Sequence, residues 1–157
     1  MTPPPEASDP ADRTDRADPA ERGRGLDDRT VDALGKLSEA LEVVEDARGH
    51  LYAFHRLCGT ADLTLGEAVD AFREAGHDEL ADRLETDLVG RNILEGRWSY
   101  QVVEEYDDGY YAAFKAHEQS ARDDLAGGER HVFEARMKED RRTHGRRHHE
   151  GSPASGA

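Results

Sequence analysis

Large side chains recur at steps of three and four residues through residues 94–117, and this spacing constrains the fold more than any other feature. Two such rows run side by side: Leu94, Trp98, Val102, Tyr106, Tyr110 and Phe114, and then Val103, Tyr106, Tyr110, Ala113 and His117. Because a helix advances about 100° per residue, both rows fall on one broad face. The spacing predicts a long amphipathic helix, which we expect to end at Gly127-Gly128.

A β-hairpin is the alternative for the same stretch. Residues 98–106 are rich in aromatic and β-branched side chains, and Asp108-Gly109 is a typical turn pair. However, Val102-Val103 and Glu104-Glu105 break the alternation of a strand, and the following sequence YYAAFKAHEQ is helical in composition. These observations favour the helix.

Three shorter helices are predicted before it. The first begins near Thr30, with Asp28 or Thr30 as its cap, and ends at Gly59; Gly49 either weakens or splits it. A second runs from Thr64 to Gly76, since Thr64 and Glu67 have the spacing of a capping box. A third begins at Asp78 and presents Leu80, Leu84 and Leu88.

The predicted fold class is therefore all-α, a single small bundle of about four helices over residues 29–140. Residues 1–28 and 141–157 are poor in large apolar side chains, and we expect them to be disordered tails, the first acidic and Pro-rich and the second rich in Arg and His. The predicted core is Leu34, Leu37, Leu41, Val44, Leu51, Phe54, Val69, Phe72, Leu80, Leu84, Leu88, Trp98, Val102, Tyr106, Tyr110 and Phe114.

The net charge limits the classes of partner that we expect, and the composition bears on the location of the chain. The formal net charge is −14, which disfavours nucleic acid and anionic membrane surfaces as partners. The chain holds a single cysteine, Cys58, which we expect to pack in the fold, and it contains no apolar run long enough to span a membrane. With no signal-peptide pattern at the N-terminus, a cytoplasmic location is expected.

One row of polar residues could bind a ligand. Glu45, Arg48, Tyr52 and His55 step three, four and three along the first helix. A carboxylate, a guanidinium, a phenol and an imidazole in one line could hold an anion or move a proton. His117 falls on the apolar stripe of the long helix and could meet this row from a facing helix. The same spacing also arises from ordinary ion pairing on a helix surface.

No motif specifies a reaction, a metal or a cofactor. Most of the acidic cluster in the long helix, Glu104, Glu105 and Asp108, falls opposite the apolar stripe and is expected to be solvated. The paired Glu-x-x-His elements of di-iron bundles are missing. We therefore name no catalytic or metal-binding residue, and whether the chain is an enzyme stays open.

The density of Trp and Tyr in the long helix suggests a function. Trp98, Tyr106, Tyr110 and Tyr111 are amphipathic side chains of the kind that anchor interfaces. Our first hypothesis is a non-catalytic interaction or structural module, whose partner is another protein or a second copy of the chain. The alternative is a ligand- or metal-binding bundle, or an enzyme, in which the Glu45 row meets His117.

Overall fold

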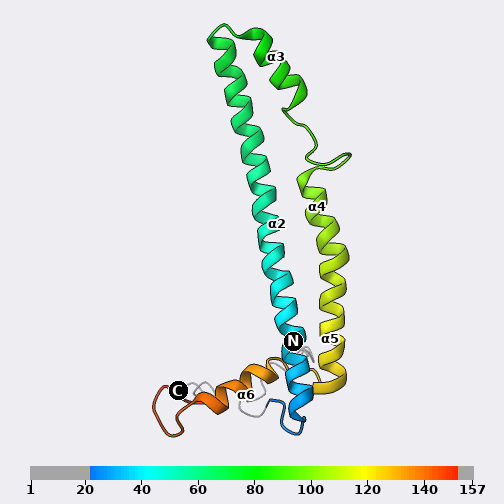
Figure 1. Ribbon diagram of the computed structural model, residues 1–157, viewed down its shortest axis with the longest axis vertical. Coiled ribbons are helices and arrows are strands. Elements are labelled where there is room, and N and C mark those ends of the chain that lie inside the picture. Colours follow the sequence, from blue (N-terminus) through cyan, green and yellow to red (C-terminus); the bar gives the residue numbers. More distant parts are fainter. Residues whose placement is uncertain (1–21, 152–157) are drawn as a thin grey trace, which may run out of the picture. The chain divides into compact units, whose positions relative to one another are not determined.

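The computed structural model describes residues 22–151, which form helices joined by short connections (Figure 1). In chain order they are α2 (Asp28–Glu74), α3 (Asp78–Asp87), α4 (Ser99–Tyr106), the π-helical turn η2 (Asp107–Tyr111), α5 (Ala112–Ala126) and α6 (Val132–Arg141). Within this range there is no strand, only one isolated bridge between Leu94 and Arg97. The predicted all-α class is confirmed. The expectations for residues 1–21 and 152–157 lie outside the described residues.

The chain divides into two units. Unit 1 comprises Met1–Glu42 with Phe114–Ala157, and unit 2 comprises Val43–Ala113. Unit 1 therefore holds the first part of α2 together with most of α5 and all of α6. Unit 2 holds the rest of α2 with α3, α4 and η2. A single domain over residues 29–140 stays a prediction.

Helix α2 replaces two of the predicted helices. It continues through Gly49, Gly59 and Gly66, so the predicted end at Gly59 and the separate helix starting at Thr64 are both wrong. Each glycine costs roughly 1 kcal/mol relative to alanine. The buried and half-buried residues of α2 continue at steps of four and three past all three glycines, so packing outweighs this cost. At the start of α2, the carboxylate of Asp27 accepts hydrogen bonds from the backbone and side chain of Thr30, which makes Asp27 the cap.

In unit 2, one face of α2 is covered by neighbouring elements. Residues at alternating steps of four and three along it are all buried or half-buried, and we call them the covered row: Val44, Arg48, Leu51, His55, Cys58, Asp62, Leu65, Val69 and Phe72. The chain turns back through α3, and α4 and η2 return alongside α2 (Figure 1). Cys58 belongs to this row and is half-buried, as expected for a side chain that packs in the fold.

The return from α2 is fixed by polar contacts as well as by packing. Arg73, in the last turn of α2, forms ion pairs with Asp82, at 3.1 Å, and with Glu85 of α3. Ala81 is fully buried. After α3, the backbone N–H of Gly90 donates to the carboxylate of Asp62 at 2.7 Å. The third helix is therefore confirmed, and its end is tied back to α2.

The long helix begins later than predicted. Leu94 and Arg97 pair across a tight turn in which Gly96 has φ +71°, and the helix starts at Ser99, with Trp98 as its N-cap residue. The side chains of Leu94 and Trp98 are consequently 54% and 66% exposed. Their predicted place in the buried stripe is wrong, because a row drawn through them assumes helical geometry that begins only at Ser99.

A π-helical turn changes which residues of the long helix are buried. In η2 the backbone hydrogen bonds skip one additional residue, as in the bond from Ala112 N–H to the carbonyl of Asp107. Because of the extra residue, each later residue is rotated around the helix axis by about one position, or roughly 100°. Tyr110 and His117 are therefore exposed, whereas Glu118 is buried. The helix is confirmed over the hairpin, but the predicted inward positions of Tyr110 and His117 are wrong.

Other predicted core residues divide by exposure. Leu34, Val44 and Val69 are buried, and Phe54 and Leu88 are exposed, contrary to prediction. The remaining predicted core residues are half-buried: Leu37, Leu41, Leu51, Phe72, Leu80, Leu84, Val102, Tyr106 and Phe114. Buried positions that the prediction left out include Val31 and Val103.

Unit 1 packs α6 closely against the first part of α2. A Cβ atom at Gly35 would lie 2.6 Å from Cγ of Phe133, so glycine is what lets this ring approach the α2 backbone. Val132 is buried, and Arg136 forms an ion pair with Asp28 at 2.6 Å. Gly23, which lies in the predicted N-terminal tail, also belongs to this packed unit. Its backbone N–H donates a hydrogen bond to the carboxylate of Glu129 at 2.6 Å.

No helix among residues 22–151 is both long enough and apolar enough to cross a membrane.

Candidate functional site

The strongest polar cluster in unit 2 joins α2 to η2. The guanidinium of Arg48 donates to both carboxylate oxygens of Asp107, from Nε at 2.7 Å and from Nη2 at 2.8 Å. The hydroxyl of Tyr52 accepts a hydrogen bond from Arg48 Nη2 at 3.0 Å and donates to Asp107 at 2.8 Å. The three side chains therefore form a closed ring of hydrogen bonds, with the two-pronged geometry that makes an Arg–carboxylate pair strong.

Aromatic rings enclose the guanidinium. The Cζ atom of Arg48 lies 4.7 Å from the ring centroid of Tyr52 and 4.9 Å from that of Tyr111. The hydroxyl of Tyr111 donates in turn to Glu45 at 3.1 Å. Three residues of the polar row predicted on the first helix thus meet Asp107 and Tyr111, which the π-helical turn presents together to α2. The side chains of Arg48 and Asp107 are 35% and 21% exposed.

Each pKa shift in this cluster moves the pKa of its group further from pH 7. The hydrogen bonds from Arg48 lower the pKa of Asp107, and the same bonds raise the pKa of Arg48. The bond to Asp107 raises the pKa of Tyr52, and burial, followed by the bond to Glu45, raises that of Tyr111. A general acid or base works best with a pKa near the working pH. The cluster is instead held in one charge state around pH 7, which suits a structural ion pair.

His55 is engaged at a separate point of the same interface. Its Nδ1 lies 2.9 Å from Oγ of Ser99, at the start of α4. Its ring meets that of Tyr100 edge-on, with centroids 5.5 Å apart. His55, Arg48 and Asp62 occupy every seventh position of the covered row, and each finds a polar partner on the returning chain.

His117, the remaining predicted ligand residue, is an exposed residue of α5 in unit 1. Its approach to His55 would join the two units and stays a prediction. Over residues 22–151, no group of three or more His, Cys, Asp or Glu side chains is arranged to hold a metal ion. The acidic residues Glu104, Glu105 and Asp108 are exposed, as predicted.

Two acidic residues in the interfaces were missed at the sequence level. Asp107 is next to the acidic cluster of Glu104, Glu105 and Asp108 in sequence, but on a helix it lies nearer the apolar stripe than they do. Glu118 is only 7% exposed and receives hydrogen bonds from Arg122, as close as 2.9 Å, and from Ser38 at 3.1 Å. Glu118 and Arg122 are four residues apart, a spacing that indicates an ion pair on one helix face. The π-helical turn that brings Glu118 to the buried face has no comparable pattern in the sequence.

The four predicted interface residues fall into two pairs. Trp98 and Tyr110 are 66% and 57% exposed. Tyr106 is half-buried, and its hydroxyl donates to the carbonyl oxygen of Val44 at 3.3 Å. Tyr111 is half-buried over Arg48. Tyr106 and Tyr111 thus contribute to the contact between α2 and the returning chain, whereas Trp98 and Tyr110 are mostly exposed.

Comparison with protein families, curated proteins and solved structures finds no match to this chain.

Proposed function

We propose that this chain is a non-catalytic interaction module that presents exposed apolar and aromatic side chains from a helical scaffold. The observation that carries the proposal is the distribution of apolar residues over residues 22–151. Seven hydrophobic side chains are buried there, against twelve large ones that are exposed. Single exposed apolar residues are common, but a protein this rich in them is expected to cover them with a partner.

The exposed set is concentrated in unit 2. It includes the aromatic side chains of Trp98, Tyr100 and Tyr110, and the aliphatic side chains of Val43 and Leu57. Tyr and Trp bury a large area at a small cost in side-chain entropy, which is why they anchor protein interfaces. These residues give unit 2 the chemistry of a docking surface for another helical or apolar surface.

The alternative of a ligand-binding or catalytic bundle has less support. In such a site, Arg48 would keep its donors for a substrate anion. The N–H donors of Arg48 are instead bonded to Asp107, and its guanidinium group is in contact with the rings of Tyr52 and Tyr111. The cluster is better suited to fixing how η2 sits on α2, and so to presenting the exposed side chains in a constant arrangement.

Site-specific photo-cross-linking in the host cell tests the proposal. A photoreactive phenylalanine analogue replaces Trp98, Tyr110 or, as a matched control, the exposed Glu104. We expect cross-links to a second polypeptide, another copy included, from the first two positions and not from the third. If positions 98 and 110 cross-link no more than position 104, the proposed function is wrong.

A further inference from the structure

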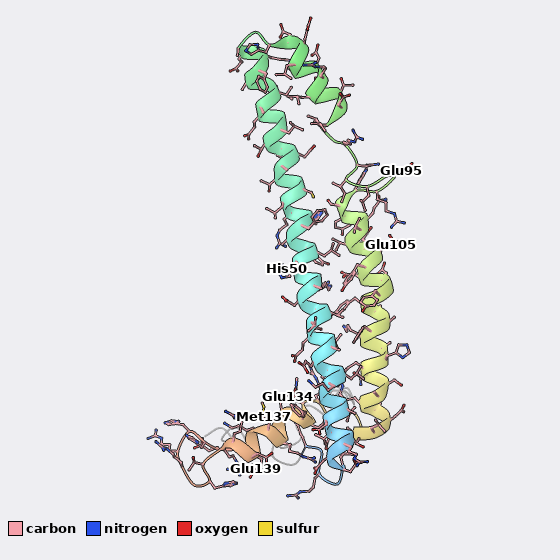
Figure 2. All side chains as sticks on the ribbon, viewed as in Figure 1. His50, Glu95, Glu105, Glu134, Met137 and Glu139 are labelled. Atoms are coloured by element: carbon pink, nitrogen blue, oxygen red, sulfur yellow. The ribbon has the colours of Figure 1, made fainter. Side chains whose placement is uncertain are left out.

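A second row of residues runs along α2 beside the covered row. Its members are one position earlier than six members of the covered row: Val43, Ala47, His50, Phe54, Leu57 and Ala61. One residue is about 100° of helix, so this row occupies an adjacent flank. All six residues are exposed, and Figure 2 shows His50 on the side of α2 away from α4. We call these six residues the open row.

The open row has the pattern of a helix-packing seam. Its steps of four and three are those of the a and d positions of a coiled coil. None of its members is Asp, Glu, Lys or Arg, although such residues make up 36% of the chain. Val43, Phe54 and Leu57 are 65%, 44% and 67% exposed. An uncharged heptad seam in water is expected to be covered by another helix.

We infer that the open row binds a second copy of itself, with two α2 helices antiparallel about a two-fold axis between His50 and Phe54. In this register Val43 faces the partner's Ala61, and Ala47 faces the partner's Leu57. Large side chains thus meet small ones, as a well-filled interface requires. At the centre, His50 faces the partner's Phe54, which brings two rings together. The seam is therefore complementary to itself, which a two-fold interface demands.

The flanking charges permit this register. On the outer edge of the open row lie Asp46, Ala53 and Thr60. Antiparallel packing places Asp46 opposite the partner's Thr60, and Ala53 opposite its own copy. No two acidic side chains meet along this edge, although the chain as a whole carries a net charge of −14. Repulsion between the two copies is therefore weakest where they touch.

This inference rests on the proposed function, because it identifies the partner of the exposed surface as the chain itself.

Sedimentation of the full chain tests the inference. Six seam positions span about 27 Å of helix, so we expect a reversible dimer with a Kd on the order of 10 µM. Leu57→Asp is expected to weaken dimerisation by about 100-fold or more, because the change enters the interface twice. Leu63→Asp is the matched control, since Leu63 is 73% exposed but lies about 120° from Leu57 round the helix.

A second variant changes affinity in the opposite direction. His50→Leu replaces the polar member of the seam and is expected to tighten the dimer by roughly 10-fold. A wild-type chain that stays monomeric at about 1 mM, far above the expected Kd, would overturn the inference. Equal effects of Leu57→Asp and Leu63→Asp on dimerisation, or no effect of His50→Leu, would also overturn it.

Disulfide trapping tests the register. Two variants, His50→Cys and Phe54→Cys, each also carry Cys58→Ser. When they are mixed and oxidised, the antiparallel register favours the disulfide between positions 50 and 54. A dominance of disulfides between identical positions would indicate parallel helices and overturn the register.

The two proposals can fail separately. If positions 98 and 110 cross-link to a different polypeptide while the purified chain stays monomeric, the second-copy inference fails and the proposed function stands. If the chain is monomeric and no cross-link rises above the Glu104 control, both fail.

Discussion

The covered row and the open row of α2 are neighbours in sequence and have opposite surroundings. The covered row includes Arg48, His55 and Asp62, yet it is buried or half-buried throughout; the open row has no formally charged residue and is exposed throughout. A simple rule that only apolar side chains turn inward would leave Arg48, His55 and Asp62 exposed, and it would bury the open row. The difference shows that partners, rather than polarity alone, decide which face of this helix is covered.

The reason is that each polar residue of the covered row meets a matching group. Arg48 has Asp107, His55 has Ser99, and Asp62 has the N–H of Gly90. A polar group that leaves water costs free energy only to the extent that it stays unpaired. Three pairings at seven-residue intervals also fix the register in which the returning chain lies on α2.

The largest test of this comparison introduces one charge into each row at adjacent positions. Val44 is 8% exposed and Val43 is 65% exposed. Val44→Asp is expected to lower the free energy of unfolding by about 3 kcal/mol or more, because it buries an unpaired carboxylate. Val43→Asp should change it by no more than about 0.5 kcal/mol. Urea unfolding followed by circular dichroism, at protein concentrations where the chain is monomeric, measures both.

If the two variants lose equal stability, the assignment of the rows is wrong.

Glycines of α2 extend the comparison to the backbone. A Cβ at Gly35 would clash with Phe133, whereas one at Gly49 would meet nothing within 4 Å. Gly35→Ala should therefore destabilise the protein by about 1–2 kcal/mol. Gly49→Ala should stabilise it by about 0.5–1 kcal/mol, since alanine loses less backbone entropy in a helix. Thermal unfolding of the two variants provides the check, and a stabilising Gly35→Ala would contradict the close packing of α6.

The smallest expected effect concerns the ion pair in the covered row. Asp107→Asn should lower Tm by roughly 2 °C, because Arg48 and Tyr52 lose a charged acceptor in a partly exposed cluster. Asp108→Asn, at the exposed neighbour, is the matched control and should change Tm by less than about 1 °C. Calorimetry of the two variants beside the wild type measures the difference. Indistinguishable Tm values would mean that the Asp107 cluster does not stabilise the fold.

The same variant removes a pH dependence. The folded-state pKa of Asp107 lies below its ordinary value of 3.8, so its ionised form stabilises the folded protein. This contribution is complete above the ordinary pKa and is lost as the pH falls through the lower pKa of the folded state. The advantage of the wild type over Asp107→Asn should therefore begin to shrink as the pH is lowered from about 5 to below 3.8. A constant difference in Tm over this range would contradict the assignment.

The sequence alone determined the local elements of this protein. For the residues that the structure describes, the spacing of apolar residues correctly predicted an all-α fold, the third helix, and a helix rather than a hairpin through Asp108-Gly109. The same reading identified Glu45, Arg48 and Tyr52 as one row. These features follow from interactions within a few turns, which a periodic pattern records directly.

Only the tertiary structure decided how far α2 runs and which faces are covered. Packing along the covered row carries α2 through three glycines that local propensity treats as stops. The π-helical turn shifts the later residues by one step, so that Glu118 is buried and His117 is exposed. Asp107 became a partner of Arg48 because two segments far apart in the chain meet. Such contacts depend on partners that periodicity within a single helix cannot identify.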